Sequence, residues 1–315
     1  MYPSIDILII SFKTSLIYTL KLISIVIPTI FIMNYLINSG ILEKISKNIL
    51  PITKHLNINS LALSSILACL FSPTVGYSIL AEGLKSNKIS EEEVIATSLA
   101  NSFPSLLSHT FTFFLPVVIP ILGLTGVLFL LIRLGVALIK TVLGMFYLKR
   151  LSKNGNIEKD IVVEGYKKKS IKTSLYSTLK FSKRLVLVMY TTMFLVILLS
   201  KLGVFQYLNS LIMPVTKTFN LNPNIGLLAL TEVINVYGAV VMAGGFLREG
   251  ILNPKEVLIG LTIGNVITFS SRYVKHSLPL HITLFGPKLG TKIVMINGAI
   301  TLLLDIFIIG FLILM

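Results

Sequence analysis

The chain repeats one short pattern after an interval of 163 residues. The segment from Gly40 to Lys54 reads GILEKISKNILPITK, and the segment from Gly203 to Lys217 reads GVFQYLNSLIMPVTK (203 − 40 = 163). Further matches at this interval are Asn57 with Asn220, Asn59 with Asn222 and Glu93 with Glu256. Duplication in an apolar chain is typical of secondary transporters, whose two copies enclose a site between them.

Beyond these matches the interval lengthens slightly. The matching pairs are His109 with His276, Pro120 with Pro287 and Gly123 with Gly290 (276 − 109 = 167). We therefore expect both halves to contain the same series of elements, with a short insertion in the second half.

The composition places the chain in a lipid bilayer. Hydrophobic residues make up 54% of it and charged residues only 13%, whereas about a quarter of a soluble globular chain is charged. Apolar runs near the roughly 20 residues that cross hydrocarbon occur at 16–37, 122–148, 185–199 and 293–314. We expect an all-α, multi-pass protein of the cell membrane, and the single Cys69 cannot form an internal disulfide.

The net charge of +15 has a topological explanation. Of the 28 Lys and Arg residues, a cluster lies between Lys149 and Arg184, as the positive-inside rule expects of a cytoplasmic loop. We therefore predict a first membrane repeat at 1–150, a cytoplasmic basic linker at 151–172 and a second repeat at 173–315. No nucleic-acid partner is expected, because no soluble domain is left to bind one.

Each half is predicted to hold the same series of elements. In the first half these are a long helix at 15–38, an amphipathic segment at 41–55, two short apolar pieces at 59–85, a broken helix at 90–120 and a long helix at 122–150.

The two short pieces form either a re-entrant hairpin or one kinked span. Twelve helical residues rise only about 18 Å, about half the membrane, and Pro73 and Gly76 fit the tip of a hairpin. If they form hairpins, each half crosses three times and the copies are inverted. If they span, each half crosses four times and the copies are parallel. Counts of Lys and Arg do not discriminate between six spans with two hairpins and eight spans.

A backbone break at membrane depth predicts a site, because free backbone groups are tolerated there only inside protein or beside a water-filled cavity. The first break carries Ser72, Thr74 and Tyr77. Its counterpart in the second half carries Asn235 and Tyr237 and lacks the proline. We predict that these five residues contact a solute.

The broken helices carry polar residues where lipid would exclude them. The candidates are Asn101 and Ser105 in the first half and Asn265 and Ser271 in the second. Such residues either hold helices together or line a solute path. An amide offers both a donor and an acceptor, so we predict that Asn101 and Asn265 form a pair at one site.

Arg272, Lys275 and His276 share one helix face, because they stand at i, i+3 and i+4. They predict an anion-binding face, unless they reach the membrane surface or pair with Glu232 or Asp305.

Glu232 is a candidate for coupling to an ion, H+ or Na+, because an intramembrane carboxylate is costly and usually functional. The alternative is that it pairs with Arg272 or Arg133. Arg133 and Lys140 lie seven residues apart on one helix face. We expect them to extend to the membrane surface or to neutralise a neighbouring helix, with Asp305 as a partner.

The segment FSPTVGYSILAEGLKSNKISEEEVIATSLANSFPS (71–105) resembles the Gate, or nucleoside-recognition, domain. That domain occurs in concentrative nucleoside transporters, ferrous iron permeases and spore maturation membrane proteins. The resemblance extends over both halves and implies inverted repeats with re-entrant hairpins. The chain lacks the soluble GTP-binding domain of the iron permeases and the extra scaffold helices of the nucleoside transporters.

These observations favour a permease for a small polar solute, nucleoside-like or an organic anion, bound between the broken helices of the two repeats. The alternative is a non-transporting membrane module that acts within a complex, as the resemblance to spore maturation proteins allows. Partners in either case include the lipid bilayer, and assembly into a homo-oligomer stays open. We expect no enzyme activity, cofactor or metal, because neither H-E-x-x-H nor a Cys/His metal spacing is present.

Overall fold

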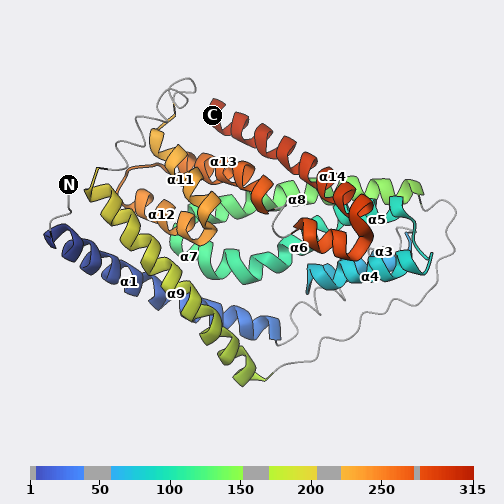
Figure 1. Cartoon of the computed structure of the whole chain (residues 1–315), viewed down its shortest axis with the longest axis horizontal. Coiled ribbons are helices and arrows are strands. Elements are labelled where there is room, and N and C mark those ends of the chain that lie inside the picture. Colours follow the sequence, from blue (N-terminus) through green and yellow to red (C-terminus); the bar gives the residue numbers. More distant parts are fainter. Residues whose placement is uncertain (1–4, 39–57, 152–169, 204–220, 273–276) are drawn as a thin grey trace.

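The computed structural model describes residues 5–38, 58–151, 170–203, 221–272 and 277–315 (Figure 1). Every regular element in these ranges is a helix, and the described residues contain 5 helical stretches that are long and apolar enough to cross a bilayer. The predicted all-α membrane fold is therefore confirmed. The amphipathic segment at 41–55 and most of the linker at 151–172 lie outside the described residues.

Four long helices form the frame: α1 (Ile5–Asn38), α8 (Leu124–Leu151), α9 (Ile171–Lys201) and α14 (Leu278–Leu314). The first begins ten residues before the predicted start at Ser15. The broken helix of the first half comprises α5 (Glu91–Ala100), α6 (Ser102–His109), the π-helix η1 (Thr110–Val118) and α7 (Ile119–Leu122). Its counterpart begins with α13 (Pro254–Arg272).

The short apolar pieces form two helical hairpins, α3 (Ser60–Cys69) with α4 (Pro73–Lys85) and α11 (Pro223–Ile234) with α12 (Val236–Arg248). In the first hairpin, Gly76 faces Cys69 and Gly83 faces Leu61, so the two helices run antiparallel. In the second, Thr231 donates to the Met242 sulfur at 3.4 Å and Asn222 to the Ile251 carbonyl at 3.0 Å. A single kinked span does not fit this geometry.

The breaks lie at Ser72 and Asn235, which share the same extended backbone, φ −157 and ψ 116. Gly76 is therefore not at the hairpin tip, where the sequence placed it. It lies inside α4, where a Cβ would come within 2.3 Å of the Cys69 sulfur. Glycine is required there by the close approach of α3.

Two of the residue pairs that recur in the sequence belong to helix caps. Asn59 and Asn222 cap α3 and α11, and their amides also donate to the carbonyls of Lys88 and Ile251, which close the bases of the hairpins. Glu93 takes part in a capping box with Ser90. Glu256 exchanges the same two bonds with Asn253. These repeated polar residues therefore hold the scaffold together.

The bounds of α12 follow those of α4 at the interval of 163 residues, since 73 + 163 = 236 and 85 + 163 = 248. Gly123 and Gly286, also 163 apart, both have positive φ, +58 and +79. Gly123 precedes α8, and Gly286 stands at a kink inside α14. The backbone therefore favours a match of Gly123 with Gly286, whereas the sequence pairs it with Gly290.

Helices in matching positions run in opposite directions (Figure 1). The Asn34 amide near the end of α1 donates to Thr178 near the start of α9 at 2.9 Å, and Phe12 near the start of α1 packs on Tyr190 further along α9. The two helices are therefore antiparallel. The same holds for α8 and α14, in which Arg133 contacts Asp305 and Lys140 contacts Thr301.

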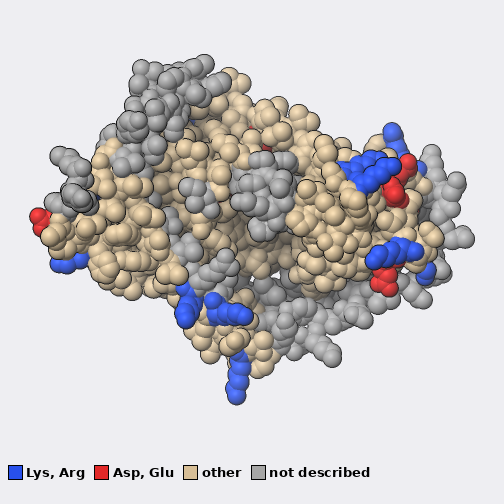
Figure 2. Space-filling model, viewed as in Figure 1, with Lys and Arg blue, Asp and Glu red and all other residues tan. Residues whose placement is uncertain are grey.

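Apolar side chains form two separate clusters. The side chains of one cluster come mainly from α1, η1, α9, α11, α12 and α13. Those of the other come mainly from α3, α4, α5 and the Leu148 end of α8. Large hydrophobic side chains of the long helices also face outward. In Figure 2 the described charged side chains lie at the left and right ends and at the lower edge of this face, and the tan surface between them is uncharged and suited to lipid.

Candidate functional site

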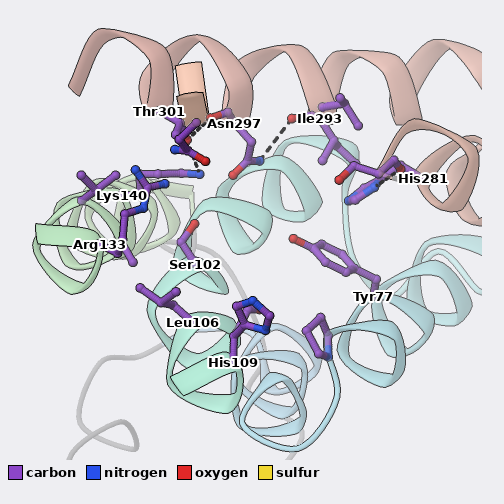
Figure 3. Close-up of a pocket in the computed structure, with 17 residues that line it drawn as sticks. Tyr77, Ser102, Leu106, His109, Arg133, Lys140, His281, Ile293, Asn297 and Thr301 are labelled. Atoms are coloured by element: carbon purple, nitrogen blue, oxygen red, sulfur yellow. Dashed lines mark hydrogen bonds between the residues drawn. The ribbon is translucent and has the colours of Figure 1, made fainter. Parts of the chain in front are cut away.

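A cavity of about 430 Å³ lies between the two apolar clusters. Its walls come from both halves of the chain: α4, α6 and α8 from the first, α13 and α14 from the second. Figure 3 shows Lys140 and Thr301 on one side of this space and Tyr77 and His281 on another. The hairpin break and the break in the first broken helix both adjoin it, through Pro73 and Ser102.

One wall is a buried polar network at the crossing of α8 and α14. Arg133 donates to one oxygen of Asp305 at 2.6 Å, and Asn265 donates to the other at 2.8 Å. The Asp305 side chain is only 1% exposed. Both carboxylate oxygens thus have a donor, as a buried charge requires.

The network continues along α14. Lys140 donates to the Thr301 hydroxyl at 3.0 Å, and Thr301 donates to the Asn297 carbonyl at 2.8 Å. The Asn297 amide reaches across to the Ser98 hydroxyl of α5 at 2.8 Å. Lys140, Asn297 and Thr301 lie near the middle of two long apolar helices, far from the ends of either.

The opposite wall is aromatic. The rings of Tyr77 and His281 meet edge to face with 4.5 Å between centroids, and Phe285 lies behind them. His281 Nδ1 lies 2.7 Å from the Ser277 carbonyl oxygen. Because a carbonyl only accepts, Nδ1 carries the proton, and in the neutral ring Nε2 is an acceptor.

His109 stands on the first broken helix, where its ring stacks on Phe113 at 5.2 Å between centroids. The helix continues as a π-helix from Thr110, and such wide turns are frequent at functional sites. Ser102, Ser105 and His109 all line the cavity on this helix.

Comparison with known proteins gives a family match for part of the chain. A family model described as Gate, nucleoside recognition, matches residues 19–125. This part of the chain is a Gate domain. The match covers the first hairpin and the first broken helix, and thus the cavity residues from Pro73 to His109.

The Gate protein has full-length relatives in Methanocaldococcus jannaschii. It is 61% identical to the uncharacterized protein MJ0871 over 300 residues, which cover 95% of each chain. It is 27% identical to the uncharacterized protein MJ0880 over 306 residues, 93% of this chain and 96% of that one. No solved structure matches the chain.

Some residues predicted from the sequence line the cavity of this Gate protein and others do not. Tyr77, Ser105 and Asn265 line it. Asn101 does not: it is fully buried, and its amide donates to Ser65 at 3.0 Å. Asn101 and Asn265 are therefore not brought together at one site in this Gate protein.

The residues predicted at the two hairpin breaks also differ in their distance from the cavity. Ser72 lies at the first break beside the cavity residue Pro73, and Thr74 is exposed. Asn235 caps α12 through bonds to the amides of Tyr237 and Gly238. Tyr237 packs on Phe113 at 5.3 Å between centroids. The second hairpin of this Gate protein thus supports the fold and does not line the cavity.

The remaining predicted charges have different positions. Glu232 is buried, 4% exposed, and packs next to Gly264, but it does not line the cavity. Arg133 pairs with Asp305, as one of the sequence alternatives proposed, and not with Glu232. The side chains of Ser271 and Arg272, and Lys275 as a whole, lie outside the described residues.

Sequence reasoning missed His281, Asn297 and Thr301 as residues of the site. It gave Arg133 and Lys140 two alternatives, the membrane surface or a neighbouring helix, and did not place them at the site, whereas both line the cavity and Lys140 is only 7% exposed. For Arg133, Lys140, Asn297 and Thr301, the signal that could have found them is their position near the centres of the two most apolar helices, far from either end. His281, in the first turn of α14, carries no such signal.

Proposed function

We propose that this protein is a permease for a small polar solute, and that the solute binds in the cavity between α4, α6, α8 and α14. The observation that carries the proposal is the cavity itself, because it is polar, central and built from both halves of the chain. The Gate description, nucleoside recognition, agrees with a small polar ligand. A nucleoside-like solute and an organic anion are both compatible with its hydroxyl, amide and imidazole groups.

We further propose that the two halves are inverted copies of one unit. Support comes from the common interval of 163 residues between their hairpins and from the opposite directions of α1 and α9 and of α8 and α14. Inverted copies allow the cavity to open to either side by rocking of one half against the other. The coupling ion, H+ or Na+, stays a prediction.

Flux measurements on the purified protein in liposomes test the proposal. We expect uptake of at least one labelled solute from a panel of nucleosides and small organic anions. Ala137, on the cavity wall, is the position to block. Ala137→Phe should abolish this uptake, because the added ring fills the space that the solute needs.

The matched control is Leu138→Phe on the same helix, at a position that is 49% exposed and faces outward. It should leave uptake unchanged. Both variants should elute as monodisperse protein on size exclusion. If no solute enters the liposomes, the protein is better explained as a non-transporting membrane module. If Ala137→Phe transports normally, the solute does not bind in this cavity and that part of the proposal is wrong.

A further inference from the structure

The charges beside the cavity do not balance among the described residues. Two cations, Arg133 and Lys140, and one carboxylate, Asp305, meet at the crossing of α8 and α14. Asp305 is occupied, since one oxygen accepts from Arg133 at 2.6 Å and the other from Asn265 at 2.8 Å. The pair of Arg133 with Asp305 is neutral, and the charge of Lys140 is left over.

Lys140 is held by a neutral group only. Its ammonium donates to the Thr301 hydroxyl at 3.0 Å, and no carboxylate of the described residues lies within ion-pair distance of it. An ammonium has three N–H donors, so donors remain for a further partner. The side chain is 7% exposed and lines the cavity. It is too far from either end of α8 (Leu124–Leu151) to reach water outside the membrane easily.

We propose that the solute carries an anionic group, a carboxylate or a phosphate, and that Lys140 binds this group in the cavity. The inference deepens the proposed function and rests on it. An ammonium removed from water is costly unless an opposite charge compensates it. A bound anion supplies that charge, whereas a neutral nucleoside does not.

The rest of the cavity suits the neutral part of such a solute. The hydroxyls of Ser102 and Ser105 line the first broken helix, and the rings of Tyr77 and His281 offer an aromatic wall. Charge is thus confined to one side of the space. This arrangement favours a small molecule with one anionic end over an inorganic ion surrounded by charges.

Pairs of ligands that differ only in charge provide the test. The purified protein in an uncharged detergent is heated with nicotinate or nicotinamide, and with uridine monophosphate or uridine. A ligand that binds the folded state raises the melting temperature. We expect the anionic member of at least one pair to raise it and the neutral member to have little effect. The carboxylate and phosphate arms identify which anion the site accepts.

Lys140→Met removes the charge and keeps the length of the side chain. We expect affinity for the stabilising anion to fall at least about tenfold, because one partner of a buried charge pair is lost. Lys140→Arg should retain most of the affinity. Lys149→Met, at an exposed position in the last turn of the same helix, is the matched control and should bind normally. Without ligand, Lys140→Met should melt at or above the wild-type temperature, because no uncompensated charge remains.

The inference is wrong if neutral and anionic members stabilise the protein equally, if Lys140→Met binds the anion as the wild type does, or if no anion in the panel stabilises the wild type. If a neutral solute is taken up and Ala137→Phe blocks this uptake, the permease proposal stands and the proposal of an anion site at Lys140 is wrong. Loss of anion binding in both Ala137→Phe and Lys140→Met supports both proposals.

Discussion

The helices α8 and α14 occupy matching positions in the two halves but carry different chemistry. At the interval of 163 residues the pairs are Arg133 with Ile296, Lys140 with Leu303, Leu138 with Thr301 and Val142 with Asp305. Each of these polar residues thus matches an apolar residue of the other helix. The polar network therefore forms only where the two halves cross, and the site requires both.

The broken helices differ in a similar way. In the first half α5 ends at Ala100 and α6 begins at Ser102, whereas α13 runs without interruption from Pro254 to Arg272. Asn101, at the break, matches Gly264 in the middle of α13 (264 − 101 = 163). The helix is interrupted beside the cavity in the first half and is continuous in the second, so matching positions need not have the same role.

The largest expected effect concerns the direction of the halves. Lys85 and Asn253 are exposed at the bases of the two hairpins. Single cysteines at these positions, in a Cys69→Ser background, should react with a membrane-impermeant reagent from opposite sides, because inverted copies place matching positions on opposite faces. Labelling of both from the same side would contradict inversion.

The next effect concerns the ion pair that joins α8 to α14. Arg133→Met should lower the free energy of unfolding by about 3–5 kcal/mol, because it leaves the buried charge of Asp305 without a partner. Thermal or denaturant unfolding in detergent measures this loss.

The control is the double variant Arg133→Met with Asp305→Asn, which removes both charges and keeps an acceptor for Asn265. It should recover most of the lost stability. A double variant no more stable than Arg133→Met alone would show that the pair is not what joins the helices.

A smaller effect concerns Gly264. A Cβ at this position would lie 2.6 Å from Glu232 Oε2 and 3.1 Å from the backbone Cα of Ala229. Gly264→Ala should therefore destabilise the protein by about 1–3 kcal/mol, because added volume strains a packed site. Gly245→Ala on α12, where nothing lies within 4 Å of the added Cβ, should be neutral or slightly stabilising in the same unfolding measurement. If Gly264→Ala and Gly245→Ala changed the free energy of unfolding equally, close packing at Gly264 would not be the reason for glycine there.

The sequence predicted the helices well because their signals are local. Apolar length identified the long helices, and Asn59, Glu93 and their counterparts recur because each half needs the same caps. The short length of the apolar pieces allowed a hairpin or one kinked span, and the resemblance to the Gate domain implied the hairpin. Its break was misplaced toward Gly76, because a glycine required for close packing looks the same in sequence as a glycine in a turn.

The site was harder to predict because it depends on which helices cross. Nothing in the sequence near Arg133 shows that Asp305, 172 residues later, faces it. For Lys140, a surface position and a cavity position have the same local sequence. The polar residues of the second hairpin looked equivalent to those of the first, but Asn235 is used as a cap. Contacts between distant segments decide such roles.

The smallest expected effect concerns the hydrogen bonds that stabilise the interruption between α5 and α6. Thr141 of α8 donates to the Ala100 carbonyl at 3.0 Å and accepts from the Phe103 amide at 2.9 Å, so one hydroxyl serves both sides of the break. Its match in the second half is Leu304, beside the unbroken α13 (304 − 141 = 163). The hydroxyl and the break therefore occur together in one half only.

Thr141→Val keeps the shape of the side chain and removes both bonds, which should cost about 1–2 kcal/mol, because backbone groups buried in the membrane lose a partner. Thr141→Ser should behave as the wild type. Thr191→Val, at an exposed position where the hydroxyl bonds only within its own helix, should change stability little. Because Ser102 adjoins the break and lines the cavity, ligand binding should weaken in Thr141→Val beyond the loss of stability. Binding that is unchanged in a destabilised Thr141→Val protein would mean that the break serves the fold alone and that the cavity does not depend on it.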